Sequence, residues 1–396
     1  MKKETVTGRL SCHRDGYGFV IPDDGGEDLF IPARYLRENL HGDRVRAAVE
    51  PHRGRGGREG RIVETLERGV STIVGRYETS GAAAFVVPDE TRITCRIAIP
   101  SAARGGARNG QTVVAQITAY PREGRDAAGR VIEVLGRPDD PEVEVLAIVR
   151  KHGLPCLFPD EVLAEAGAVP GNVTDDDRQG RVDLRHETTV TIDGETARDF
   201  DDAVSVTREE GGTILLKVSI ADVSHYVKPG SPLDLEALNR GTSVYFPDRC
   251  IPMLPEVLSN GICSLNPGEE RLTVTAAMRF DREGELLEAA FYPSVIRSDQ
   301  RLTYTEVKEI LVDRRKETIA RHRSLLGDLS TMEELALRLR EKRRRRGSID
   351  FDLPEPEIVL DLQGRPESIG RAERNLAHSI IEEFMLAANE AVASHM

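Results

Sequence analysis

The sequence predicts a multidomain protein with two small all-β barrels in tandem, followed by a larger unit of mixed α/β structure. The chain has 396 residues, enough for two to four domains with separate cores. Short alternating apolar segments, broken by Gly and Pro, fill the first third and repeat their plan once. Beyond residue 137, β-branched segments are followed by long helical patterns, which together are typical of mixed structure.

The two barrels are expected at residues 1–69 and 70–137. In the first, the segments GYGFVI and DLFIP precede HGDRVRAAV, each with the alternation of a short strand. The second repeats this plan loosely, because AFVVP answers GFVIP and NGQTVVA answers HGDRVRA. We therefore interpret the N-terminal third as a tandem duplication.

The third domain is expected at residues 138–396, after a linker of sequence RPDDP and with EVEVLAIVR at its start. Its strand patterns lie near 188–192, 203–206, 213–220 and 272–280. Its helical patterns lie at 304–311, 325–345 and 375–392.

The last predicted helix has a strong apolar face, on which lie Ile380, Ile381, Phe384, Met385 and Ala388. Only His395 and Met396 follow it, so little downstream chain remains to cover that face. We expect that the natural polypeptide continues or that this chain is a fragment.

Composition favours a soluble, cytoplasmic protein. No apolar run reaches membrane-spanning length, and the start MKKE leads into a polar segment rather than a signal region. Five widely spaced cysteines contain no CxxC pair, which argues against a disulfide framework and a zinc site. We expect no membrane partner and reduced thiols in the core.

The net charge of −13 is unevenly distributed. Residues 1–136 carry 21 basic against 18 acidic side chains, whereas the remainder carries 33 against 49. Binding to a polyanion depends on where the positive potential lies, so the overall charge does not exclude it. The negative overall charge does make purely electrostatic, non-specific binding to a polyanion less favourable.

The strongest chemical signal is the segment TIDGETARDFDD at 191–202. It holds four aspartates within ten residues: Asp193, Asp199, Asp201 and Asp202. Carboxylates held this close repel one another unless hard divalent cations neutralise them. Magnesium is the expected occupant, since its sites use one or two carboxylates, water and substrate phosphate oxygens.

Two other interpretations of this acidic segment fit the sequence less well. A solvated acidic turn fits poorly, because Ile192, Phe200 and Ala203 are interleaved with the acids and would be buried. A structural calcium loop also fits poorly, because the EF-hand ligand spacing is missing.

Aromatic residues in the first barrel form a candidate RNA-binding platform. Tyr17 and Phe19 lie on one face of a strand, with Phe30 available from the next strand. Aromatic residues on a barrel strand are also ordinary core, so that alternative stays open. The second barrel keeps Phe85 but lacks the paired aromatics, and we expect a weaker contact there.

Other polar and aromatic positions carry little signal by themselves. Tyr245 and Tyr304 are isolated aromatics that, taken alone, favour core roles. The arginine run at 343–346 is typical of a solvated helix end. Glu382 and Glu383 could form the polar edge of the last helix.

Several long motifs give these residues a context. They are HRDGYGF, HGDRV, DGETARDFDDA, ADVSHYV, SVYFP, IPMLPEVLSNGICSLNP and DFDLP. With these motifs in order, the chain resembles the ribonuclease II/ribonuclease R family of 3′-to-5′ exoribonucleases, with the ribonuclease R branch the nearer of the two. The resemblance covers nearly the whole chain.

The resemblance implies two tandem cold-shock-type OB barrels and a mixed α/β RNB catalytic domain that is incomplete at its C-terminal end. The four aspartates would then be the catalytic, metal-binding set. Tyr245 would clamp nucleotides near the 3′ end, Tyr304 would be a further site aromatic, and Glu382 or, as we predict, Glu383 would lie near the terminal nucleotide.

The implied reaction is two-metal hydrolysis of single-stranded RNA with Mg²⁺ and no small-molecule cofactor, releasing nucleoside 5′-monophosphates. Asp201 is expected to be essential for chemistry and to matter little for affinity. The family continues with a basic motif at the scissile phosphate and a further OB-type domain, neither of which this sequence contains. The alternative is therefore an RNA-binding fragment without turnover.

Overall fold

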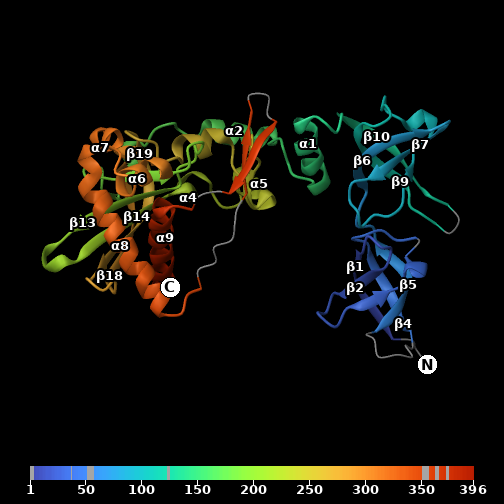
Figure 1. The fold of residues 1–396 in the computed structure, drawn as a ribbon, viewed down its shortest axis with the longest axis horizontal. Helices are drawn as coiled ribbons and strands as arrows, with labels where there is room; N and C mark the ends of the chain where they lie inside the picture. The colour runs from blue at the N-terminus through green and yellow to red at the C-terminus, as the bar shows by residue number, and fades with distance from the viewer. Residues whose placement is uncertain are drawn as a thin grey trace. The chain divides into compact units, whose positions relative to one another are not determined.

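The computed structural model describes residues 4–36, 38–50, 58–122, 125–349, 356–361, 365–371 and 374–396, so the DFDLP motif at 350–354 lies outside it. The chain divides into two compact units: Met1–Cys156 with Leu362–Arg365, and Leu157–Asp361 with Pro366–Met396. Each unit is described by itself (Figure 1).

The first unit contains two closed barrels, as the sequence predicts. The first has strand order β1-β2-β3-β5-β4 and comprises β1 (Thr5–Cys12), β2 (Gly18–Pro22), β3 (Leu29–Ile31), β4 (Arg44–Glu50) and β5 (Glu59–Glu67). The second has order β10-β8-β7-β6-β9 and comprises β6 (Thr72–Ser80), β7 (Ala83–Pro88), β8 (Ile97–Ala98), β9 (Thr112–Ala119) and β10 (Ala127–Gly136).

A pair of glycines supports the duplication at the level of register. Gly8 is paired with Pro22 in the first barrel, and Gly75 is paired with Pro88 in the second. A Cβ at Gly8 would lie 2.1 Å from the Ile21 carbonyl oxygen, and one at Gly75 would meet the corresponding carbonyl at 2.2 Å. Both first strands therefore need glycine at the same close approach of two backbones.

Helix α1 (Pro141–His152) packs against the second barrel through β6, β9 and β10. Asp140 caps its start by accepting from the Glu142 amide at 3.0 Å, and Gly153 ends it at a φ of 62°. Arg150 donates to both carboxylate oxygens of Glu133 on β10. The helix thus belongs to the compact unit of the barrels, whereas the sequence grouped it with the third domain; the boundaries 1–69, 70–137 and 138–396 stay a prediction.

The second unit is built on a seven-stranded sheet of order β11-β18-β17-β14-β13-β12-β19. Its strands are β11 (Val182–Asp183), β12 (Val190–Asp193), β13 (Asp202–Arg208), β14 (Ile214–Ala221), β17 (Glu270–Phe280), β18 (Leu286–Arg297) and β19 (Gln300–Thr303). Two small ribbons accompany it: β15 (Val244–Tyr245) with β16 (Cys250–Ile251), and β20 (Pro356–Leu360) with β21 (Pro366–Arg371).

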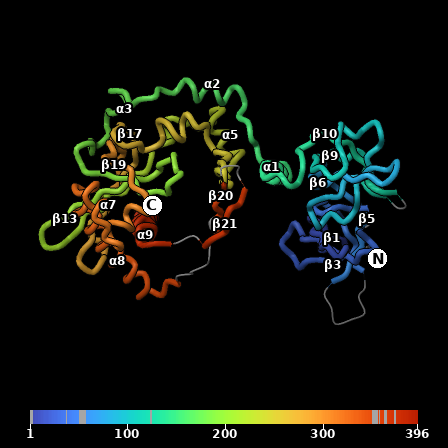
Figure 2. Tube along the Cα trace, turned by 45° about the horizontal axis from the view of Figure 1, so that its top comes forward, coloured from blue at the N-terminus to red at the C-terminus, as the bar shows by residue number. Residues whose placement is uncertain are grey.

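Helices surround this sheet. They are α2 (Asp160–Ala168), α3 (Asp175–Arg178), α4 (Val223–Tyr226), α5 (Pro232–Arg240), α6 (Tyr304–Leu311), α7 (Lys316–Arg321), α8 (Leu326–Arg345) and α9 (Leu376–His395). The largest core cluster joins β12, β13, β14, β17 and β19 to α6, α8 and α9. Figure 2 also shows α9 beside α8.

The predicted helices at 304–311, 325–345 and 375–392 are therefore confirmed. Ile380, Ile381, Phe384 and Ala388 of α9 are buried against preceding elements of the chain. These residues of its apolar face are thus covered by the sheet, α6 and α8. Among the described residues, no helix is long and apolar enough to cross a membrane.

Strand β18 was not predicted, because its sequence, LLEAAFYPSVIR, lacks a β-branched run and contains Pro293.

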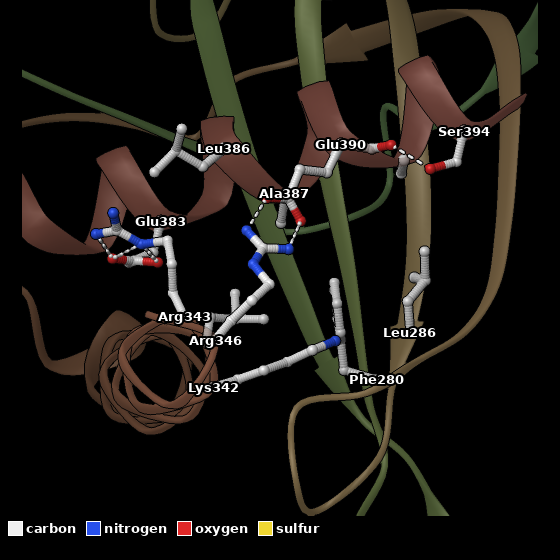
Figure 3. Close-up of a pocket in the computed structure, with 12 residues that line it drawn as sticks. Phe280, Leu286, Lys342, Arg343, Arg346, Glu383, Leu386, Ala387, Glu390 and Ser394 are labelled. Atoms are coloured by element: carbon white, nitrogen blue, oxygen red, sulfur yellow. Dashed lines mark hydrogen bonds and ion pairs between the residues drawn. The ribbon is translucent and has the colours of Figure 1, made fainter. Parts of the chain in front are cut away.

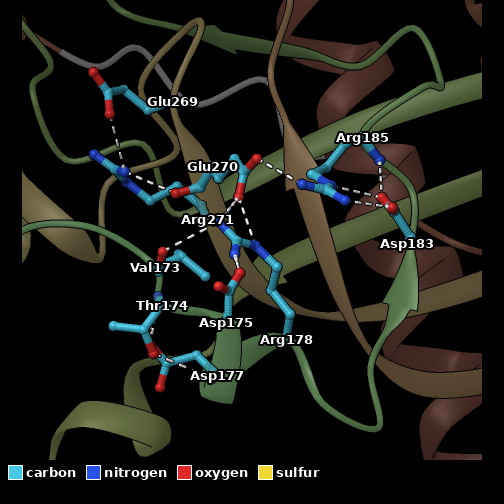
Figure 4. A network of polar contacts seen from close by, with 10 residues as sticks. All are labelled: Val173, Thr174, Asp175, Asp177, Arg178, Asp183, Arg185, Glu269, Glu270 and Arg271. Atoms are coloured by element: carbon cyan, nitrogen blue, oxygen red, sulfur yellow. Dashed lines mark hydrogen bonds and ion pairs between the residues drawn. The ribbon is translucent and has the colours of Figure 1, made fainter.

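A network of charge pairs holds the segment that precedes β12 against the sheet. Glu270 at the start of β17 accepts from Arg178 of α3 and from Arg185, and Arg185 also binds Asp183 of β11 (Figure 4). This network ties α3 and β11 to the neighbouring strand.

Candidate active site

The sheet brings two of the four aspartates to the same end of a strand pair. Asp193 is the last residue of β12, and Asp202 is the first residue of β13. The two strands are antiparallel neighbours, so the end of one lies beside the start of the other. Asp202 is also paired with Ile220 of β14, and Asp193 with Thr303 of β19.

Phe200 fixes the other two aspartates. Its side chain is 7% exposed, its amide donates to the Ser264 hydroxyl at 3.0 Å, and its carbonyl accepts from the Leu265 amide at 2.9 Å. The backbone between Asp199 and Asp201 is thus anchored at the buried Phe200. Ser264 belongs to the SNGICSLNP motif, which thereby gains a structural role.

Burial and the negative charge of neighbouring aspartates raise the pKa of three of these carboxyl groups. Burial, then the charge of Asp202, raises the pKa of Asp193 to about 7, although Arg301 opposes the shift. Burial and Asp199 raise the pKa of Asp201, and burial and Asp201 raise that of Asp202. Concentrated negative charge that is partly withdrawn from water is the environment that a divalent cation relieves.

The donor set fits Mg²⁺ in its chemistry, since all four groups are carboxylates at one end of a strand pair. Within the described ranges, however, no group of three His, Cys, Asp or Glu side chains is arranged so as to hold a metal ion. Binding would therefore require these side chains to turn toward a common point. The metal-ligand assignment stays a prediction.

Tyr245 lies at this acidic cluster. Its hydroxyl donates to Asp199 Oδ2 at 2.8 Å, while 66% of the residue remains exposed. Burial of the hydroxyl and the bond to Asp199 raise the pKa of Tyr245 to about 12, so it remains a donor at ordinary pH. An exposed ring anchored by its polar end is suited to stacking on a base.

Tyr304, the first residue of α6, is also near the cluster. Burial, followed by the charges of Asp193 and Asp202, raises its pKa to about 12. Its ring stacks on His378 of α9, with centroids 3.9 Å apart and planes 20° from parallel. His378 was missed from the sequence, because a single histidine in a helix gives no signal of an aromatic partner 74 positions earlier.

Arg301 was also missed. Its Nη2 donates to the carbonyls of Gly194 and Glu195, at 2.6 and 3.0 Å, and its guanidinium lies 5.6 Å from the centre of the Phe200 ring. It therefore contacts both ends of the loop between Asp193 and Asp201. Its Nε is buried and has no hydrogen-bond partner in the described structure.

Glu383 occupies a different environment. It is 4% exposed on α9 and forms an ion pair with Arg343 of α8, with Nη2 and Oε1 2.6 Å apart (Figure 3). Glu382 is more exposed and binds Arg374. Arg346, at the end of the arginine run, pairs with Glu390. Arg343 and Arg346 thus neutralise acids of α9, whereas Arg344 and Arg345 pair with Glu341 of α8. The RNA contact of Glu383 stays a prediction.

The three aromatic residues predicted in the first barrel do lie together. The Tyr17 ring centre is 6.0 Å from that of Phe19 and 5.8 Å from that of Phe30, and the two phenylalanines are 5.6 Å apart. Phe19 is 38% exposed. In the second barrel, the Arg96 guanidinium covers the Phe85 ring at 4.6 Å. Only the first barrel thus presents an open aromatic platform among the described residues.

Comparisons with protein families agree with this architecture. A family described as RNB domain matches residues 181–396, which is more than half of the chain. A cold shock domain matches residues 85–159, and a family described as Ribonuclease B OB domain matches residues 8–65.

Individual relatives and a solved structure are similar to the chain over most of its length. Ribonuclease R of Thermotoga maritima is 44% identical over 99% of this chain and 55% of the relative. Ribonuclease R of Escherichia coli is 42% identical over 98% and 48%. Mycoplasma genitalium RNase R in complex with ribose methylated single-stranded RNA superposes with a TM-score of 0.89 at 28% identity, over 98% of this chain and 61% of that one. The chain thus spans about half the length of these curated relatives.

Proposed function

The chain belongs to the RNB-domain family, and from that premise we propose that it is a magnesium-dependent 3′-to-5′ exoribonuclease that hydrolyses single-stranded RNA to nucleoside 5′-monophosphates. The observation that carries the proposal is the convergence of Asp193 and Asp202 at one end of a strand pair, with Asp199 and Asp201 on the loop between them.

The four aspartates would hold the cation. When bound, Mg²⁺ supplies charge neutralisation at the scissile phosphate and a lowered pKa for the attacking water. The protein's own contribution is to bring the four aspartates near one another: the sheet sets the backbone positions of Asp193 and Asp202, and the anchored backbone of Phe200 sets those of the two acids beside it.

The aromatic residues would hold and orient the RNA. Tyr245 offers an exposed ring tied to Asp199, which suits it to clamp a nucleotide near the 3′ end. Tyr304 is braced by His378 and would limit the space beside Asp193. In the first barrel, Tyr17, Phe19 and Phe30 would stack other bases of the strand. A contact of Glu383 with the terminal nucleotide would require its pair with Arg343 to open.

The test is incubation of the chain with Mg²⁺ and a 5′-labelled, single-stranded RNA. A ladder that shortens from the 3′ end, with 5′-monophosphates identified by mass spectrometry, is expected. A matched RNA with a blocked 3′ end should be shortened more slowly. RNA binding without any shortening would instead favour the alternative, an RNA-binding chain without turnover.

We also propose a cytoplasmic location. All five cysteines are free thiols, and Cys12, Cys95 and Cys263 are at least partly buried. Unpaired thiols persist in a reducing compartment. Labelling with a thiol reagent in intact cells and in lysate, with equal reactivity of Cys156 before and after a reductant, would test this.

A further inference from the structure

A cavity of about 420 Å³ lies between the two barrels of the first unit. The first barrel contributes Cys12, His13 and Leu36 to its lining, and the second contributes Arg92, Ile93 and Cys95. Arg122 and Arg125, which come after β9 and before β10, also line it. The volume is within the range of small-ligand sites and suits one nucleotide rather than a helix or a folded partner.

His13 connects this cavity to the aromatic platform. Its ring stacks on Tyr17, with centroids 4.6 Å apart and planes 15° from parallel. A tight turn holds the two rings together, because the His13 amide donates to the Tyr17 carbonyl and Gly16, at a φ of 88°, donates back to His13. The platform of three rings is thus extended by a fourth ring that lines the cavity.

The orientation of the His13 ring is also fixed. Its Nδ1 lies 3.3 Å from the Asp15 amide, which donates to it. The same nitrogen lies 3.3 Å from Asp15 Oδ2, so the backbone and the side chain of Asp15 both approach this edge of the ring. A ring held by stacking on one face and by a backbone hydrogen bond at one edge loses little freedom when a base stacks on its other face.

The cationic groups of the cavity differ in their availability. Arg92 is bound by both carboxylate oxygens of Glu90, at 2.9 and 3.0 Å, so its charge is compensated. Arg122 and Arg125 are exposed, and no ion pair links either guanidinium to an acid in the described part of the chain. Asp126 is the acid that shares the lining with them.

A flat ring and two exposed guanidinium groups line the same cavity, and they match the two halves of a nucleotide. Base stacking requires a π-face and tolerates any base, whereas guanidinium groups bind phosphate through paired N–H donors. The apolar side chains of Leu36, Leu40 and Ile93 line the same cavity and would exclude water from the base.

We propose that this inter-barrel cavity binds one nucleotide of single-stranded RNA, with its base stacked on His13 and its phosphate held by Arg122 and Arg125. This inference rests on the proposed RNA substrate and adds a site separate from the aspartate cluster. An RNA strand bound to the aromatic platform of the first barrel would extend into the cavity, which the second barrel also lines. Both barrels would then hold the same strand.

The first experiment measures the affinity of a fluorescently labelled single-stranded RNA by anisotropy, in EDTA so that no cleavage occurs. His13→Ala and the double variant Arg122→Ala/Arg125→Ala should each weaken binding about 5- to 100-fold. A matched double variant, Arg76→Ala/Arg108→Ala, removes the same charge from exposed positions of the second barrel and should change the affinity no more than about twofold. Thermal melting of all variants reports whether they fold.

Pocket variants that bind RNA like the matched control would overturn the proposal. If the wild-type chain bound no RNA at all, both this inference and the proposed function would fall. If it bound RNA but released no mononucleotides with Mg²⁺, the cavity proposal would stand, because the affinity measurement does not depend on cleavage.

A second experiment separates an RNA strand from a free nucleotide as the occupant. Cys95 lines the cavity, whereas Cys156 is an exposed internal reference. Alkylation followed by mass spectrometry should show that RNA slows modification of Cys95 relative to Cys156, and that adenosine 5′-monophosphate at the same nucleotide concentration does not. Protection by the free nucleotide and none by RNA would contradict the assignment to a strand.

Discussion

At the scale of single residues, Asp193 has the most perturbed chemistry of the acidic cluster. Its pKa of about 7 in the folded chain is well above the value near 4 that an unfolded chain gives an aspartate. The folded state therefore holds this proton more tightly. The resulting stability is fully present below about pH 4 and is lost as the pH rises through about 7.

Without divalent cations, the melting temperature should thus fall between pH 5 and pH 8. Asp193→Asn removes the charge, so it should raise the melting temperature at pH 8 and flatten this pH dependence. Asp313→Asn, an exposed site away from the cluster, serves as the matched control. Calorimetry at both pH values measures this, and a variant as pH-dependent as the wild type would show that Asp193 is not the perturbed group.

Two variants of Tyr245 distinguish the contribution of its ring to RNA binding from that of its hydroxyl. Tyr245→Ala should weaken single-stranded RNA binding about 5- to 100-fold through lost stacking. Tyr245→Phe keeps the ring and loses only the bond to Asp199, so its affinity should stay within about twofold of wild type. Both should melt like wild type, because the side chain is largely exposed. Equal losses in the two variants, measured by anisotropy, would assign the effect to the hydroxyl instead.

At the scale of elements, the loop between β12 and β13 is held by residues from far along the chain. Ser264 binds the backbone of Phe200, and Arg301 binds the carbonyls of Gly194 and Glu195. The acids themselves could be predicted because four aspartates in ten residues are a dense local signal. Arg301, Ser264 and His378 could not, because a lone polar residue acquires such a role only when folding brings distant segments together.

Arg301→Ala should loosen this loop and weaken Mg²⁺ binding, while Arg301→Lys should restore part of both. Hydrogen exchange of the amides at 194–201 and calorimetric titration with Mg²⁺ measure the two effects without any cleavage assay. Arg297→Ala, at an exposed position on β18, is the matched control. Unchanged exchange at 194–201 in Arg301→Ala would contradict the clamping role.

In the secondary structure, too, local signals could be predicted from the sequence, whereas features that depend on distant segments could not. The helices at 304–311 and 325–345 were predicted almost to the residue, because strong 3.6-residue spacing is a local property. Strand β18 was missed because its place in the sheet depends on its pairing with β17 rather than on its own composition. The apolar face of α9 was recognised, but its partners precede it in the chain and could not be identified from sequence.

At the scale of the whole molecule, the first third and the remainder of the chain differ in net charge. The first 136 residues have a small basic excess, and the remainder is strongly acidic. RNA affinity should therefore depend on stacking and a few phosphate contacts more than on net charge. The logarithm of the binding constant should fall with the logarithm of salt concentration with a slope of about −3 or shallower. A much steeper slope in anisotropy titrations would indicate a charge-driven mode.

The central claim is that the aspartate cluster performs chemistry while other residues supply the affinity. Paired measurement of mononucleotide release and RNA affinity for wild type and Asp201→Asn tests it most directly. We predict that the variant releases no detectable 5′-monophosphate with Mg²⁺, while its affinity stays within about twofold of wild type. Retained release, or loss of RNA binding together with cleavage, would contradict the account.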